Sequence, residues 1–216
     1  MIRITPIDDP EIREYLSGYE TLGGIIDFKV FRIGEAASPA AAHTAVARLM
    51  LDLLQEDNDN DFKQLGAPSG TVAEQYYNLR NRQLDAGEGT AVTLKQFFGP
   101  YFDLETRGLV SPGQAGLSSE AVSQANDFVI KGYTDAFLNP PHSFGQGNMT
   151  IAELEAYFNA FNAYFFGDTG HCVVYAWPVD CSGYFDAGKE WWGSYFWTVY
   201  NPGKDWYVGI AVSGTD

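Results

Sequence analysis

The five tryptophans of this chain all lie within one window of thirty residues, from Trp177 to Trp206. Seven further aromatic residues lie in this window or directly beside it: Tyr175, Tyr184, Phe185, Tyr195, Phe196, Tyr200 and Tyr207. Aromatic side chains contribute the largest apolar areas to cores and to interfaces. The window therefore forms either the centre of a packed sheet or a recognition surface.

The pattern after Gly167 predicts three strands, at 172–177, 194–200 and 206–213, because valine, aromatic and β-branched residues dominate these stretches. The turn sequence Asn-Pro-Gly-Lys at 201–204 makes the last two strands a hairpin. Strand 194–200 is apolar on both faces, so we expect it at the centre of the sheet. Strand 206–213 has one bulky face and one small-residue face, against which a helix can lie closely.

Capping residues and apolar stripes predict five or six helices before this sheet. The best-marked helices are expected near 39–55, 71–84, 93–102, 119–138 and 150–166. Residues 25–33 alternate like a half-exposed strand, which we expect to join the C-terminal sheet. The fold class is therefore a single α+β domain over 1–216, with the helical N-terminal two-thirds packed on a small antiparallel sheet formed mainly by the C-terminal third. The stretch 108–118, rich in glycine, serine and proline, is the best candidate for a sub-boundary.

The chain carries 28 acidic and 13 basic residues, a formal net charge of −15. No arginine follows Arg107, so the C-terminal half lacks the cations that clamp phosphates. This excludes nucleic acid and anionic membranes as favoured ligands and favours a basic protein partner, although a negative charge also simply keeps a protein soluble. We expect a cytoplasmic protein, because neither an apolar leader nor a membrane-length apolar run is recognisable. The oligomeric state stays open.

The acidic run Asp57-Asn-Asp59-Asn-Asp61 has the alternating oxygen ligands of a calcium loop. Phe62 stands where the turn needs glycine, and Pro68 stands where the bidentate glutamate belongs. We therefore expect a solvated loop after a helix and no metal. The three scattered histidines do not make a metal site. No glycine-rich phosphate loop is present, so no cofactor is expected.

His171 and Cys172 open a predicted strand, and Asn201 ends a later one. This arrangement resembles the late part of papain-like cysteine hydrolases, over about forty residues, and implies a hydrolase or an inactive derivative with its site near these three residues. The family's nucleophile lies far upstream, whereas no cysteine precedes Cys172 here. Cys172 and Cys181 are too few for a disulfide framework, and we expect both to be reduced.

The loop 180–193 is long for a connection between adjacent strands. It combines aromatic rings with carboxylates, a composition typical of interface hot spots. The candidate partner-binding residues are Tyr184, Phe185, Trp191, Trp192, Asp186 and Glu190. The alternative is that these rings fold back as a lid over the core.

No catalytic set accompanies these features. Our first hypothesis is an acidic protein that binds a basic protein, as an inhibitor or an immunity-type neutraliser would. The papain-like reading is the second hypothesis, and an aromatic-lined pocket for a carbohydrate or another small ligand is the third.

Overall fold

A computed structural model describes residues 2–34, 38–66, 68–111, 128–141, 149–167, 169–190 and 192–214. The helices in this part of the chain are α1 (Pro10–Thr21), α2 (Pro39–Leu65), α3 (Val72–Tyr77), α4 (Leu94–Phe98), α6 (Phe128–Leu138), α7 (Ile151–Phe166) and α8 (Asp186–Glu190). The strands are β1 (Ile4–Ile7), β2 (Asp27–Ile33), β3 (Thr90–Val92), β4 (Phe102–Asp103), β5 (Gly108–Leu109), β6 (Val173–Ala176), β7 (Gly193–Asn201) and β8 (Trp206–Gly214).

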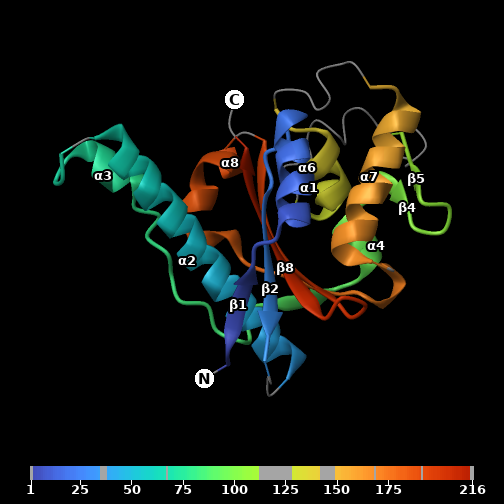
Figure 1. The fold of residues 1–216 in the computed structure, drawn as a ribbon, viewed down its shortest axis with the longest axis horizontal. Helices are drawn as coiled ribbons and strands as arrows, with labels where there is room; N and C mark the ends of the chain where they lie inside the picture. The colour runs from blue at the N-terminus through green and yellow to red at the C-terminus, as the bar shows by residue number, and fades with distance from the viewer. Residues whose placement is uncertain are drawn as a thin grey trace.

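Six of the described strands form one antiparallel sheet in the order β1-β2-β8-β7-β6-β3. The sheet separates two layers of helices, with α1, α6 and α7 on one side and α2 and α8 on the other (Figure 1). Strand β7 lies between β8 and β6, which confirms its predicted central position. Strand β2, which corresponds to the strand predicted at 25–33, pairs with β8. Its predicted place in the C-terminal sheet is therefore also confirmed.

The first face of the sheet carries the larger aromatic core. Trp197 and Trp206 are 6% and 5% exposed and pack with phenylalanines of α4 and α7. The indole Nε1 of Trp206 donates to the carbonyl oxygen of Phe165 at 2.9 Å. The aromatic window is thus largely the centre of a packed sheet.

Helix α2 lies directly on the second face of the sheet. A side chain added at Gly209 would come within 3.1 Å of the Met50 sulfur of α2. The small-residue face of β8 therefore admits the helix, as its alternation predicts. The α2 residues that are buried in this cluster with Phe31 are Val46, Ala47, Met50, Leu51 and Leu54.

Several predicted helix starts are confirmed by their hydrogen bonds. The Asp9 side chain accepts from the Ile12 amide, and the Ser38 hydroxyl accepts from the Ala41 amide. Capping boxes begin α4 and α7 at Thr93 and Thr150. Each start satisfies amides that the first helical turn leaves without partners.

Three expectations about elements need correction. Helix α2 continues through the acidic run to Leu65, so the predicted loop after it is helical. Helix α3 ends at Tyr77, well before residue 84, and the chain then runs extended because Leu79 and Leu84 are drawn into the second core. Strand β2 alternates as predicted over residues 27–30, where Phe28 and Val30 are buried and Asp27 and Lys29 are half-buried, but Phe31 is fully buried on the face that was expected to be exposed.

The structure describes the candidate sub-boundary 108–118 only as far as residue 111, and its first two residues form β5, which pairs with β4. Residues 112–118 lie outside the described residues, as do residues 119–127 of the expected helix 119–138. None of the described helices is both long and apolar enough to cross a bilayer.

Candidate functional site

The loop 180–193 folds against the second face of the sheet through two short 3-10 turns (Val179–Cys181 and Gly183–Phe185) and α8. Phe185 is fully buried, with its ring centroid 5.5 Å from that of Phe196. The expectation that the loop exposes Phe185 is therefore wrong. Phe185 belongs to one buried cluster with Phe196 and Ala211.

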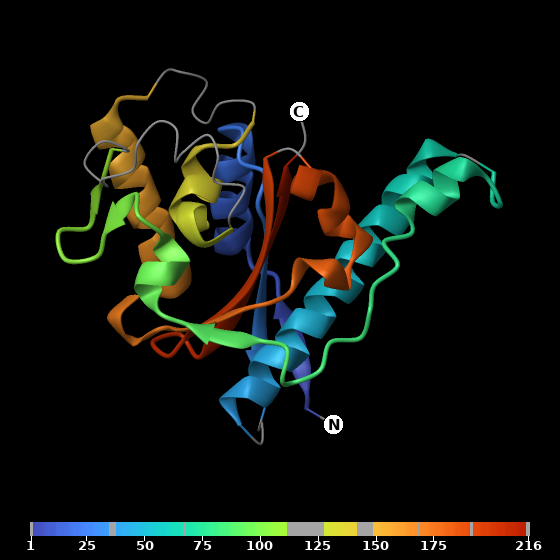
Figure 2. The same cartoon turned by 180° about the vertical axis from the view of Figure 1, so that it is seen from behind.

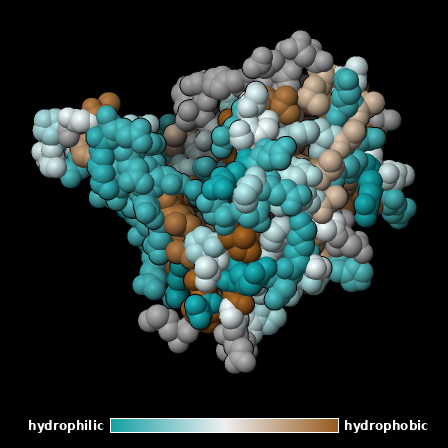
Figure 3. All heavy atoms as spheres, in the orientation of Figure 1, coloured by the Kyte–Doolittle hydropathy of each residue, from teal (hydrophilic) through white to brown (hydrophobic). Residues whose placement is uncertain are grey.

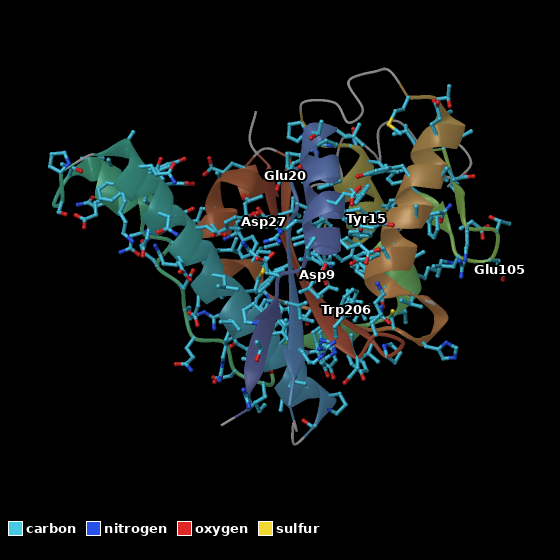
Figure 4. The ribbon with its side chains drawn as sticks, viewed as in Figure 1. Asp9, Tyr15, Glu20, Asp27, Glu105 and Trp206 are labelled. Atoms are coloured by element: carbon cyan, nitrogen blue, oxygen red, sulfur yellow. The ribbon has the colours of Figure 1, made fainter. Side chains whose placement is uncertain are left out.

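Tyr184 is half-buried, and its hydroxyl donates to the Asp27 carboxylate at 2.5 Å. Burial raises the pKa of Asp27, and the Tyr184 hydrogen bond and Lys29 only partly offset it. Asp27 lies near Glu20 at the end of α1, another carboxylate that raises its pKa (Figure 4). Tyr184 thus holds the loop to β2.

Trp192 is also half-buried, and its indole Nε1 donates to the carbonyl oxygen of Asn139 at 2.7 Å. Asp186 and Glu190 are exposed, and Asp186 forms ion pairs with Arg80 and Lys189 at 3.4 and 3.0 Å. Trp191 lies outside the described residues. Most of the described aromatic side chains of the loop therefore cover the core, whereas its carboxylates Asp180, Asp186 and Glu190 are exposed.

Of the three residues of the papain-like resemblance, His171 is exposed at the end of a 3-10 turn (Thr169–His171), and Cys172 and Asn201 form local structural contacts. The Cys172 thiol donates to the Phe166 carbonyl oxygen at 3.0 Å. Asn201 is 1% exposed; its amide nitrogen donates to Phe165, and its amide oxygen accepts from Gly203 and Lys204 at the hairpin turn. The side chain of Asn201 therefore organises the turn. Cys172 and Cys181 are both free thiols.

A polar cluster that the sequence did not reveal lies between α2 and the sheet. The Trp177 indole donates to the Thr198 hydroxyl oxygen at 2.9 Å, and that hydroxyl lies 2.8 Å from Nδ1 of His43. Because an indole N–H can only donate, the Thr198 hydroxyl oxygen accepts from Trp177, and the hydroxyl proton of Thr198 is free to be donated to Nδ1 of His43. His43 is fully buried, its Nε2 has no hydrogen-bond partner among the described residues, and burial lowers its pKa to about 4.

An apolar hollow of about 360 Å³ opens where β6 leaves the sheet. The Tyr195 and Trp197 rings of its wall are stacked at 4.9 Å. Trp177 also lines the hollow, and Gln96 supplies an amide. The size of the hollow fits one small ring.

The second half of α2 and all of α3 form a two-helix arm, defined here as residues 52–77, that projects from the body (Figures 1 and 2). The arm carries a hollow of about 550 Å³ whose lining includes Phe62, Tyr77, Asp59 and Glu74. Hydrophilic residues cover its visible face, with hydrophobic atoms at the far end (Figure 3). The signals for this surface are the acidic run, which we expected to form a loop, and the Tyr76-Tyr77 pair, which lies within the predicted helix 71–84.

No cluster of potential metal ligands occurs in the part of the chain that the structure describes. Comparison of the chain with protein-family models and with curated proteins found no match.

Proposed function

We propose that this chain is a binding protein for a basic protein partner. The observation that carries the proposal is its unbalanced charge, with 28 acidic and 13 basic residues. If every lysine and arginine were paired with a separate carboxylate, 28 − 13 = 15 carboxylates would still lack a cation from this chain. A surface of this kind attracts cationic proteins and speeds their association.

The exposed carboxylates Asp186 and Glu190 support the proposal, as do those of the arm. Neutralisation of a basic partner by an inhibitor or immunity-type protein is the activity that best fits this charge. We place that activity in the cytoplasm, because the two free thiols suit a reducing compartment.

The test is affinity capture from the native host with the whole chain as bait and an unrelated protein of equal negative charge as control. We expect a basic partner that binds this chain and not the control. Its association should slow as added salt shortens the Debye length to about 3 Å near 1 M. A partner of neutral or acidic charge, with association insensitive to salt, would overturn the proposal.

A second candidate function is the binding of a small ring compound in the 360 Å³ hollow, which the stacked Tyr195 and Trp197 rings favour. Titration with small aromatic compounds and monosaccharides should then change the tryptophan fluorescence. Val92→Trp would fill the hollow and should abolish that change. A response that persists in this variant would exclude the hollow as its source.

A further inference from the structure

Helix α2 extends well beyond the residues that pack against the sheet. Its last buried residue is Leu54, and residues 55–65 extend it by a further eleven residues, roughly 16 Å at the rise of an α-helix. Both ribbon views show this half of α2 pointing away from the sheet with α3 beside it (Figures 1 and 2). The outer part of the arm therefore adds nothing to the core of the body.

Local contacts hold the arm together. Gln55 donates from its amide to the Tyr77 carbonyl oxygen at 3.1 Å and accepts from the Leu79 amide at 2.8 Å. Asn58 also donates to the Tyr77 carbonyl oxygen, at 3.3 Å. The Phe62 and Tyr77 rings lie 5.7 Å apart. Aspartate and asparagine are weak helix formers, so these contacts with the returning chain maintain the helix through its acidic run.

Exposed apolar side chains gather on the arm. Val72 and Tyr76 are each 81% exposed, and Leu65 is 59% exposed. The only other large apolar side chains that are exposed in the described residues are Ile151 and Val173. The arm thus presents apolar surface at the place where it is farthest from the body, as an interaction surface does.

Charge identifies the kind of partner. Residues 52–77 contain six acidic residues and one lysine. The 550 Å³ hollow combines the carboxylates of Asp59 and Glu74 with the Phe62 and Tyr77 rings. Lys63 also lines it, which leaves a net charge of −1. A carboxylate can accept further hydrogen bonds beside those that Gln55 and Gly70 already donate. Carboxylates beside aromatic faces suit a guanidinium or ammonium group.

From these observations we infer that the arm is the docking surface for a basic, partly apolar segment of a partner protein. An arginine or lysine of that segment enters the hollow between Asp59 and Glu74, and its apolar residues contact Leu65, Val72 and Tyr76. This inference rests on the proposed function and places the contact on the arm rather than on the loop 180–193.

The test uses a short labelled peptide of alternating arginine and leucine as the probe, with a glutamine-leucine peptide as its control. Binding to the whole chain is measured by fluorescence anisotropy at low salt. The arm variant Asp59→Asn with Glu74→Gln is compared with Glu14→Gln with Glu105→Gln, which removes two charges from exposed sites on the body. Tyr76→Ala is compared with Ile151→Ala, because Ile151 is 75% exposed on α7.

We expect the arm double variant to weaken binding of the arginine peptide by about tenfold or more, and the body double variant to change it less than about twofold. Tyr76→Ala should weaken binding and Ile151→Ala should not. All six substituted residues are exposed or half-buried, so no variant should melt below the wild type, and loss of binding cannot be attributed to unfolding.

Equal weakening by the two double variants would overturn the arm as the docking surface and leave the preference for a basic partner intact. Normal binding by Tyr76→Ala would overturn the apolar part of the inference. If the wild-type chain bound the arginine peptide no better than the glutamine peptide, the proposed function would fail as well.

Discussion

His43 shows how a single buried side chain makes the stability of this fold depend on pH. Burial lowers its pKa to about 4, whereas an unfolded chain has a histidine pKa of about 6.5. Between these values the unfolded state binds more protons than the folded state, so the free energy of unfolding decreases as the pH falls. The full loss from this residue is about 3 kcal/mol.

His43→Phe should remove this part of the acid sensitivity. Denaturant unfolding of wild type and variant at several pH values between 7 and 4 measures the difference in their slopes. Asp27, whose pKa is raised by burial, acts with the opposite sign, but it does so in both proteins and cancels. Parallel pH dependence in the two proteins would show that His43 does not stay neutral in the core.

Cys181 is a second residue whose surroundings decide its chemistry. It is fully buried, and burial raises the pKa of its thiol to about 11. Since the thiolate is the reactive form, iodoacetamide should label Cys181 slowly near neutral pH. Mass spectrometry after timed labelling, with the urea-unfolded chain as control, measures this rate. Rapid labelling of Cys181 in the folded chain would contradict this prediction and favour the papain-like hypothesis.

At the scale of elements, the central position of β7 makes Trp197 the most informative tryptophan. It is 6% exposed and lies on a strand paired on both sides. Trp197→Ala should lower the free energy of unfolding by about 3–5 kcal/mol. Trp192→Ala is the matched control, because Trp192 is only half-buried, and it should cost clearly less. Equal losses would show that the loop 180–193 is as much a part of the core as β7.

The crossing of α4 and α6 depends on Gly132. This residue has φ of 70° within α6, and an added Cβ would lie 2.7 Å from the Cα of Gly99. Gly132→Ala should therefore destabilise the protein by on the order of 3 kcal/mol, from backbone strain and steric overlap. Gly87→Ala meets no atom within 4 Å and should be nearly neutral in the same denaturation assay. A neutral Gly132→Ala would mean that the two helices separate at little cost.

The elements that the sequence predicted well are those whose local signals agree with their packing. In β8, alternation of bulky and small residues predicts both the aromatic core and the close approach of α2 at Gly209. In α4 and α7, the capping residues fix the first turn and an apolar stripe fixes the buried face. Local and tertiary preferences coincide in these elements, so a short window of sequence is enough.

The incorrect predictions are at places where distant contacts decide the outcome. The acidic run is helical because the returning chain around Tyr77 bonds to Gln55 and Asn58, which no window around residue 57 contains. The loop residue Phe185 is buried because it packs with Phe196 and Ala211, which lie on two strands outside the loop. The sequence directed attention to the aromatic rings and carboxylates of the loop 180–193, but the most exposed aromatic side chain in the described residues is Tyr76, on the arm.

At the scale of the whole molecule, the same net charge that suits a basic partner opposes folding. A net charge of −15 concentrates like charges in the compact state and destabilises it relative to the unfolded chain. Exposed ion pairs such as Arg13–Asp8 offset little of this repulsion, since each contributes about 0–1 kcal/mol. Repulsion should therefore dominate the response of the protein to salt.

We expect the thermal midpoint of the free protein to rise as sodium chloride is increased from about 0.01 M to about 0.15 M, because the Debye length falls from about 30 Å to about 8 Å. Glu14→Gln with Glu105→Gln should begin at a higher midpoint in low salt and gain less from added salt, since fewer charges remain to be screened. Scanning calorimetry of both proteins over this range measures the two responses. A wild-type midpoint that falls with salt would mean that attractive pairs outweigh the repulsion, and the 15 excess carboxylates would then be less available to a basic partner than their number implies.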